Sequence, residues 1–488
     1  MASLIGFIDG ANAQLYITIV HESTGSIVST VQSFACQSFI NIILPKLFNS
    51  TDFKAVIINT CNVISTDFKD TLQFRKAVKE KLDQMKIINY YITKENFVQS
   101  QCLIAANYSS NLDDIVLIVM GAGENVVVSE LRYTENGYKI LRTDRFLTNE
   151  RQRLENPEAI SQRIYSFCKP KKIILSSANF ELSAPPKYLK AMLKLSNKLI
   201  VVDRQNFIDI SIIETFKMFD DKSYVKFRIL PICSREYHLG FKYGSKCHRK
   251  IVAEFGEALP FKKSVFVSKS CLEFYNAHRN ELVLEVDEGN LPTFQVKEII
   301  LDSVKNLPKK LSANLKGIPI IAFYDDSSVI CVWKNGKFQF LDGWNGMYGK
   351  QLLIAFDEVK PKFCDEASEA HRRKPSFVVS DLIKIMSRSP EEQQINNCHF
   401  KITKDSKNPI LIEFDNYGGI KKAATPAFLM AMLLKEHFKA IKEETTNLKL
   451  TEFGFYFIDE TEDEKIERIK KQIKESCGML KIGCNFVT

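Results

Sequence analysis

Two apolar segments separated by a short turn sequence open the chain, and this start constrains its fold more than any other feature. Residues 4–8 and 15–20 have the apolar and β-branched composition that is typical of strands. Between them stands Asp9-Gly10-Ala11-Asn12, and an Asp-Gly pair flanked by apolar strands is a strong signal for a tight hairpin turn. We therefore predict an antiparallel hairpin over residues 4–20.

Length and composition place the chain among globular proteins with more than one domain. Its 488 residues exceed what one hydrophobic core usually serves, so we expect two or three domains. The content of 45% hydrophobic and 26% charged residues argues against disorder. No signal peptide is expected before the first strand, and no apolar run reaches the length of a membrane span. The 12 cysteines lack Cys-x-x-Cys spacing, so we expect reduced thiols in a cytoplasmic protein without a metal site.

The charge balance gives little reason to expect a nucleic-acid partner. The net charge of +9 is mild for this length. Its basic clusters, residues 169–172 and 371–374, are short and lack the interleaved aromatic residues of a single-strand binding groove. We interpret both as solvated surface, and we expect neither nucleic acid nor membrane as a partner.

The pattern of apolar residues divides the chain into three parts. Residues 1–220 alternate strand and helix patterns, with helices expected over 70–85 and 209–218. Residues 222–308 show short alternating runs, such as 225–229, 264–267 and 282–286, which predict a compact β domain. A linker is expected at 309–314. From residue 318 to 488 an α/β pattern resumes, with a hairpin at 329–340 and a last helix over 463–477.

The order of these pieces resembles the seventy-kilodalton heat-shock chaperone family, which belongs to the actin-like ATPase superfamily. The similar stretches include residues 237–241, 258–260 and 286–289 in the β part, and 332–337 and 363–367 in the last part. The resemblance implies an actin-like (ribonuclease H-like) nucleotide-binding fold over 1–220, an all-β sandwich of the peptide-binding type over 222–308, and a second, partial actin-like α/β segment over 318–488. This arrangement would be divergent and rearranged relative to the family.

The same resemblance implies a nucleotide site at two hairpins, with ATP or ADP and magnesium as cofactor. Its residues would be Asp9, Gly10 and Asn12 in the first hairpin and Gly121 and Gly123 in the second. Glycine turns let backbone N–H groups converge on a phosphate, and the alternative explanation of the two later glycines is a hairpin turn that simply needs positive φ.

Most positions at which the family carries catalytic groups hold other residues here. The carboxylate positions read Ile8 (with Asp9 displaced by one residue), Val119 and Ala322, the catalytic lysine position falls near Ser380, and a glutamate position reads Phe486. Because carboxylates hold magnesium and a lysine stabilises the transferred phosphoryl group, we expect weak or absent hydrolysis and assign no catalytic residue. The alternative is a working ATPase that uses Asp9 with Glu95 or Glu124.

The β part carries the implied peptide site. Alternating apolar residues such as Val265, Val267 and Val286 could face either a groove for extended peptide or the core. Lys226 and Arg228 interrupt the apolar linker expected at 224–230, so we predict an ordinary edge strand there. The function implied is a chaperone-like protein that binds unfolded or extended polypeptide or partner chaperones. A functional ATP-dependent chaperone and a non-enzymatic interaction protein are the alternatives.

Overall fold

The computed structural model describes residues 3–48, 52–150, 153, 156–166, 168–178, 184–193, 197–243, 246–269, 276–389, 400–445, 450–458 and 462–487. Its contacts divide the chain into two compact units. Unit 1 comprises Met1–Tyr237, Ala253–Phe261 and Glu285–Thr293, and unit 2 comprises His238–Val252, Lys262–Leu284 and Phe294–Thr488. Among the described residues, no helix has both the length and the apolar character that crossing a bilayer requires.

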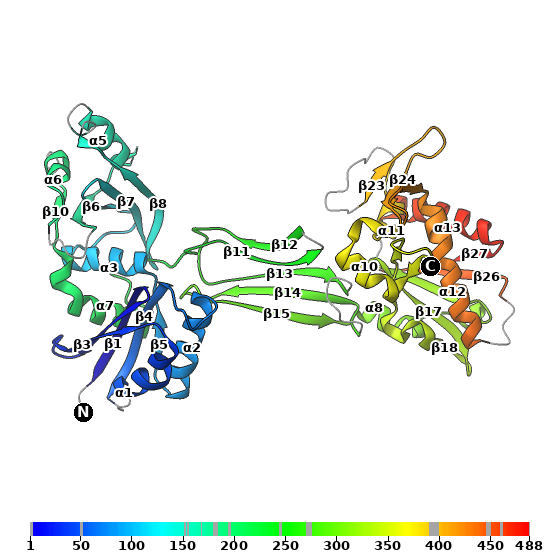
Figure 1. Cartoon of the computed structure of the whole chain (residues 1–488), viewed down its shortest axis with the longest axis horizontal. Coiled ribbons are helices and arrows are strands. Elements are labelled where there is room, and N and C mark those ends of the chain that lie inside the picture. Colours follow the sequence, from blue (N-terminus) through cyan, green and yellow to red (C-terminus); the bar gives the residue numbers. More distant parts are fainter. Residues whose placement is uncertain are drawn as a thin grey trace. The chain divides into compact units, whose positions relative to one another are not determined.

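The first sheet of unit 1 contains the predicted hairpin. Its five strands lie in the order β3-β2-β1-β4-β5 (Figure 1). The pairs β1–β2 and β2–β3 are antiparallel, and β1–β4 and β4–β5 are parallel. The bounds are β1 (Leu4–Asn12), β2 (Gln14–His21), β3 (Ile27–Phe34), β4 (Phe53–Val63) and β5 (Asn89–Tyr91). Between β4 and β5 lies α2 (Thr71–Gln84), which Asp70 caps by accepting a hydrogen bond from the Gln73 amide.

The second sheet of unit 1 repeats this arrangement. Its strand order is β10-β9-β6-β7-β8, with β6–β7 and β7–β8 antiparallel and β6–β9 and β9–β10 parallel. The bounds are β6 (Ile115–Ala122), β7 (Asn125–Thr134), β8 (Gly137–Leu147), β9 (Lys172–Ser177) and β10 (Leu199–Val201). Around it lie α5 (Pro157–Tyr165) and α6 (Lys187–Leu193).

Helices α3 (Lys94–Ala106) and α7 (Ile208–Asp220) join the two sheets into one unit. Every residue of α3 from Asn96 to Ile104 is buried, as expected for a helix that packs on more than one side. Its Phe97 packs with Phe7 of β1, and its Cys102 lies in the core beneath β6. Further helical segments of this part are α1 (Leu44–Leu47) and the single turns Phe39–Ile43 and Arg204–Phe207.

The β part forms two small sheets. One pairs β11 (Tyr237–Tyr243) with β12 (Lys246–Ala253), and the other has the order β13-β14-β15, with β13 (Phe261–Ser268), β14 (Arg279–Val286) and β15 (Pro292–Ile299). The prediction of strands at 264–267 and 282–286 is confirmed. The predicted edge strand at 225–229 is wrong, because this stretch forms no strand and only Ile229 makes an isolated bridge, to Tyr138.

The α/β part of unit 2 is built on a sheet of order β18-β17-β16-β26-β27. Helices α12 (Pro426–Glu444) and α13 (Asp463–Leu480) pack against each other beside it (Figure 1). Its bounds are β16 (Ile320–Tyr324), β17 (Ser327–Lys334), β18 (Lys337–Phe340), β26 (Glu452–Phe457) and β27 (Gly483–Phe486). The predicted hairpin at 329–340 is therefore confirmed, and the last helix extends three residues beyond its predicted end.

Shorter elements complete unit 2. The stretch expected as a linker at 309–314 instead ends α9 and contributes the buried Leu311 to a core. The elements among the described residues are α8 (Asp302–Lys305), α9 (Leu307–Lys310), α10 (Ser368–Arg373), α11 (Leu382–Met386), β19 (Lys350–Gln351), β20 (Ile354–Ala355), β21 (Lys362–Phe363), β22 (Val378–Val379), β23 (Lys401–Thr403), β24 (Leu411–Asp415) and β25 (Lys421–Ala424), with the single helical turns Ala313–Leu315, Asp342–Trp344, Gly346–Tyr348, Cys364–Ala367 and Pro375–Phe377.

Candidate functional site

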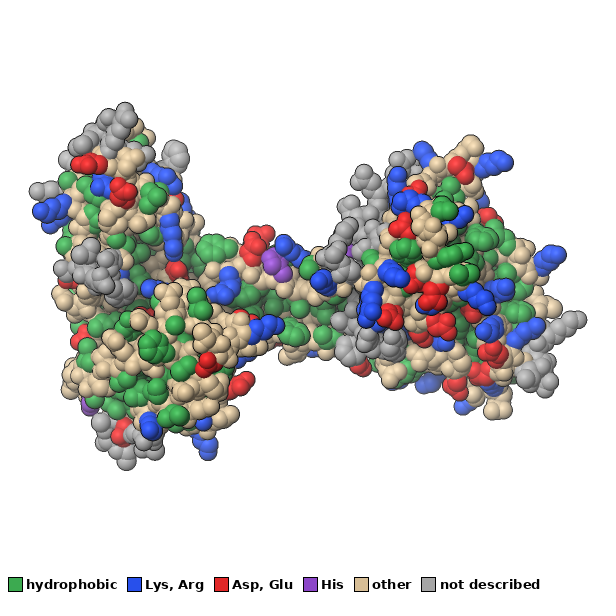
Figure 2. Space-filling view, viewed as in Figure 1, with side chains coloured by type: hydrophobic (Ala, Val, Ile, Leu, Met, Phe, Trp, Pro, Cys, Tyr) green, Lys and Arg blue, Asp and Glu red, His purple; other side chains and the backbone are tan. Residues whose placement is uncertain are grey.

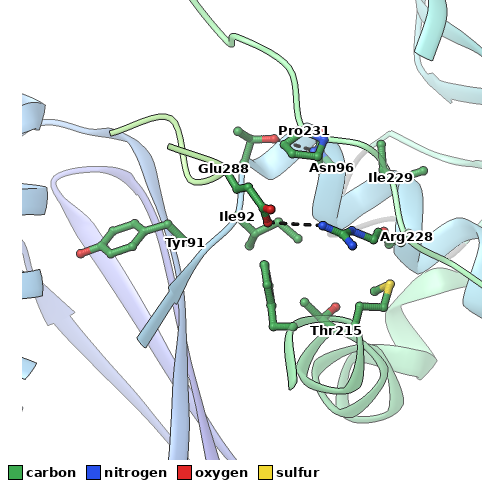
Figure 3. A pocket seen from close by; sticks show the side chains of 12 residues that line it. Tyr91, Ile92, Asn96, Thr215, Arg228, Ile229, Pro231 and Glu288 are labelled. Carbon is green, nitrogen blue, oxygen red and sulfur yellow. Dashed lines mark hydrogen bonds and ion pairs between the residues drawn. The ribbon is translucent and has the colours of Figure 1, made fainter. Parts of the chain in front are cut away.

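A small cavity in unit 1 lies where four segments meet (Figure 3). The β5–α3 connection and α3 form one side, and α7 forms another. Residues 224–231, which we call the docked segment, and residues 287–291, the turn between β14 and β15, close it. Its volume of about 30 Å³ suits one water molecule and is far too small for a nucleotide or a peptide. The cavity therefore marks a junction at which four segments of unit 1 pack together.

The docked segment is tied to the second sheet through its backbone. The Tyr138 amide donates to the Arg228 carbonyl (2.7 Å), and the Leu230 amide donates to the Tyr138 carbonyl (2.8 Å). Gly137, with φ +121°, permits this approach, since a Cβ there would lie 2.5 Å from the Arg228 carbonyl oxygen. Phe227 and Ile229 are buried in the core beneath β6. The segment is thus an irregular strand-like connection packed on unit 1.

The charged residues of the docked segment, from which we predicted an exposed edge, have polar partners. Lys226 donates to the side-chain oxygen of Asn107 (3.2 Å). Arg228 lies 3.3 Å from the carboxylate of Glu288, and the two side chains point toward each other in Figure 3. Lys222 reaches the same carboxylate at 3.0 Å. The charges lie beside the apolar contacts, so the segment packs without burying an unpaired cation.

The 287–291 turn is held mainly by Arg75 of α2. This guanidinium is only 3% exposed and donates to the carbonyls of Gly289 (2.5 Å) and Asn290 (3.0 Å). The buried Asn290 side chain donates to the Ile232 carbonyl and accepts from the Ser234 amide. With the Tyr237 hydroxyl, which donates to the Asn290 carbonyl at 3.0 Å, these contacts provide partners for the buried carbonyls of the turn.

The first hairpin turns later than the Asp-Gly pair suggests. β1 continues to Asn12, so Asp9 and Gly10 lie within the strand, and only Asn12 (φ 54°) lies at the turn. Gly10 packs closely on Val63, since a Cβ there would lie 2.4 Å from its Cγ2. The Asp9 carboxylate accepts a hydrogen bond from the Asn59 amide group (2.7 Å). Burial raises the pKa of Asp9, and nearby Lys94 opposes this effect.

The second hairpin has a two-residue turn at Gly123-Glu124. Only Gly123 has positive φ (57°), and a Cβ there would meet no atom within 4 Å. Gly121 lies in β6, where its missing side chain makes room for Leu189: a Cβ would lie 2.4 Å from the Leu189 Cδ1. The position of the expected carboxylate, Val119, is fully buried. The two hairpins thus belong to different sheets of unit 1, and each glycine has a structural role.

The alternative carboxylates both have arginine neighbours. Glu95 lies 3.4 Å from Arg145, and Glu124 lies 3.9 Å from Arg153. Within the described residues, no group of three or more His, Cys, Asp or Glu side chains could hold a metal ion. At the positions where the resemblance implies carboxylates for magnesium, the described hairpins of unit 1 instead carry Ile8 and Val119, both fully buried.

The corresponding hairpin of unit 2 borders a larger cleft, of about 360 Å³. Asp326, buried at its edge, accepts hydrogen bonds from the backbone amides of Asp381 (2.6 Å) and Leu382 (2.9 Å). Asp325 pairs with Arg279, with 2.8 Å between Nη2 and Oδ1. Burial raises the pKa of Asp326 well above its usual value, and the neighbouring Asp381 adds to this effect. The Asp326 carboxylate thus accepts hydrogen bonds from two backbone N–H groups that would otherwise be available to a bound anion.

The predicted peptide-contacting residues lie mostly inside. Val267 and Val286 are buried, and Val265 is half-buried. Their neighbours on the edge strands are exposed instead: Phe266 of β13 is 58% exposed and Phe294 of β15 is 67% exposed. Sequence alternation identified the strands and left open whether these valines face the core or a groove, because period 2 alone does not say which face is covered.

Comparison with protein families finds no family model that matches the chain. A search among curated proteins finds no sequence that matches it.

Proposed function

We propose that this chain is a heat-shock-chaperone-like protein that binds extended polypeptide or partner chaperones and hydrolyses ATP weakly or not at all. Three sheets with one strand order support an actin-like organisation of 1–220 and 318–488. Two exposed phenylalanines on edge strands support a polypeptide site in the β part, since extended peptides bind sheet edges through backbone pairing and side-chain pockets.

The proposal of low ATPase activity is supported by the residues at the three hairpins. Val119 and Ala322 are fully buried apolar residues, and Asp326 is satisfied by backbone amides of its own unit. Without carboxylates for magnesium and a cation at the phosphoryl group, several kcal/mol of transition-state stabilisation are missing.

The test of binding uses the full chain and a fluorescent apolar peptide, followed by anisotropy. The double variant Phe266→Ser/Phe294→Ser should weaken binding about tenfold or more, corresponding to at least about 1.4 kcal/mol. The matched control Phe34→Ser/Phe255→Ser removes two comparably exposed phenylalanines, 63% and 67% exposed, and should bind as the parent does.

The test of the nucleotide response adds Mg-ATP to the preformed complex. Peptide release should stay unchanged, and steady-state turnover should be far below that of ordinary chaperones. Release by ATP, or ordinary turnover that Asp9→Asn abolishes, would support a functional ATP-dependent chaperone. Absence of peptide binding would leave the non-enzymatic interaction protein.

A further inference from the structure

Basic residues dominate the first three strands of the β part. Residues 237–253 and 261–268 contain no aspartate or glutamate and six basic residues: Lys242, Lys246, Arg249, Lys250, Lys262 and Lys263. The side chains of Lys242, Arg249, Lys250 and Lys262 are exposed. Strands β11, β12 and β13 therefore present an excess of positive charge to solvent.

Exposed apolar groups lie among these cations. Lys263 of β13 donates to the Val252 carbonyl of β12 (3.0 Å), so β13 runs beside the end of β12. Val252 and Phe266 are both exposed apolar residues of these two strands, and the Lys250 ammonium lies 5.4 Å from the Phe241 ring. Figure 2 shows blue and green side chains, with some red and purple ones, interspersed along this strand region.

Acidic residues of neighbouring segments lie close to basic residues of this part. On β14, Glu281 pairs with Lys297 of β15 at 3.8 Å. Asp381 of the α/β part lies close enough to Lys250 to be influenced by its charge. Lys242 and Arg249 remain as exposed cations of a surface whose own strands contain no carboxylate.

We propose that the polypeptide bound here is one whose apolar residues are flanked by aspartate or glutamate. The inference rests on the proposed function and names its substrate class. An extended segment that adds to β13, an edge strand of the described sheet, would place its apolar side chains near Phe266 and its acidic flanks near the cations of β11 and β12. Complementary charge selects partners and speeds association, and salt screens it.

The experiment uses the full chain and two fluorescent peptides with the same leucine-valine centre, one flanked by glutamates and one by lysines. Binding is measured at about 0.01 M and about 0.15 M salt, where the Debye length is about 30 Å and about 8 Å. At low salt the glutamate-flanked peptide should bind at least about tenfold more tightly than the lysine-flanked peptide. The ratio of the two affinities should be smaller at the higher salt. Lys242→Gln/Arg249→Gln should lower the ratio several-fold. Lys401→Gln/Lys422→Gln, which removes two exposed lysines of the β23–β24–β25 sheet, should leave it unchanged.

The outcomes separate the inference from the function on which it rests. Equal affinity for both peptides, or tighter binding of the lysine-flanked one, overturns the inference and leaves polypeptide binding intact. A ratio that falls as much in the control variant as in Lys242→Gln/Arg249→Gln also overturns it, because the preference would then come from net charge. Failure of both peptides to bind overturns the proposed function and the inference together.

Discussion

Arg228 Nη2 lies 3.3 Å from Glu288 Oε2, and this contact connects two segments that are separated by 60 residues in the sequence. Arg228 belongs to the docked segment, and Glu288 belongs to the turn between β14 and β15. Lys222, just before the docked segment, contacts the same carboxylate, so one acidic residue pairs with two basic residues. The docked segment and the 287–291 turn therefore form one set of contacts on unit 1, and substitutions in either should affect both.

Gly137→Ala should loosen the docked segment. The new Cβ would lie 2.5 Å from the Arg228 carbonyl oxygen, and φ of +121° disfavours any residue but glycine. We expect trypsin to cleave after Lys226 and Arg228 roughly tenfold faster, since local opening exposes the segment. Gly336→Ala is the control, because Gly336 also has positive φ (80°) but has no atom within 4 Å of the new Cβ. Equal cleavage of both variants and the parent would show that Gly137 does not govern docking.

Arg75→Met should destabilise unit 1 through the 287–291 turn. The substitution keeps much of the side-chain volume and leaves the carbonyls of Gly289 and Asn290 without this donor. We expect a loss of about 1–3 kcal/mol in the free energy of unfolding, measured by urea denaturation. Arg132→Met removes an exposed arginine of β7 and should change stability by less than about 0.5 kcal/mol. A loss no larger than that of the control would contradict the role given to Arg75.

Asp326→Asn should change how the stability of unit 2 depends on pH. Burial raises the pKa of Asp326 in the folded state above the ordinary value of 3.8, so its favourable contribution is fully present below that pH. The contribution is lost as the pH rises from 3.8 through the raised pKa, because the buried carboxyl must then ionise. Relative to the parent, the asparagine variant should therefore gain stability as the pH rises. Urea denaturation of both proteins across this range measures the difference, with Asp342→Asn as the control for loss of an exposed carboxylate. A difference that does not change with pH would count against the argument.

Gly121→Ala and Gly123→Ala should differ in stability, and neither should reveal a nucleotide site. At Gly121 the added methyl group must displace Leu189 and Pro186, which costs about 1–3 kcal/mol. At Gly123 an added methyl group is opposed only by the positive φ of the backbone, which should cost about 1–2 kcal/mol or less in the free energy of unfolding. Calorimetric titration with Mg-ATP should give weak or undetectable heat for the parent. Strong binding that both variants abolish while remaining folded would instead place nucleotide at this turn.

Local patterns predicted those parts of the fold that local interactions determine. The helix predicted over 70–85 forms as Thr71–Gln84, because its apolar spacing and the Asp70 cap act within the segment itself. The hairpin at 329–340 has its turn at Asn335-Gly336, where both residues adopt positive φ. In the first hairpin the same kind of signal misplaced the turn. There Gly10 is needed for packing against Val63 and Leu15, which the local sequence does not show.

The candidate site depended on distant partners, and here sequence reasoning failed. Alternating Val225, Phe227 and Ile229 describe a strand and a packed irregular segment equally well, and the choice is made by Tyr138 in another sheet. Arg75 gave no signal at all, since an arginine in an amphipathic helix is usually solvated and its carbonyl partners lie more than 200 residues away. The nearest signal in the sequence is the Asn136-Gly137 pair, which favours a turn with positive φ.

The contacts of Arg75 also have a consequence for biosynthesis. Arg75 leaves the ribosome 215 residues before Asn290, the residue whose carbonyl it binds. Until that later stretch is made, the nascent N-terminal part must keep a guanidinium destined for the interior in contact with water or with a chaperone. Contacts of such sequence separation form late and slow the completion of a domain. Closure of unit 1 around Arg75 therefore waits until residues 285–293, its last segment, have been made.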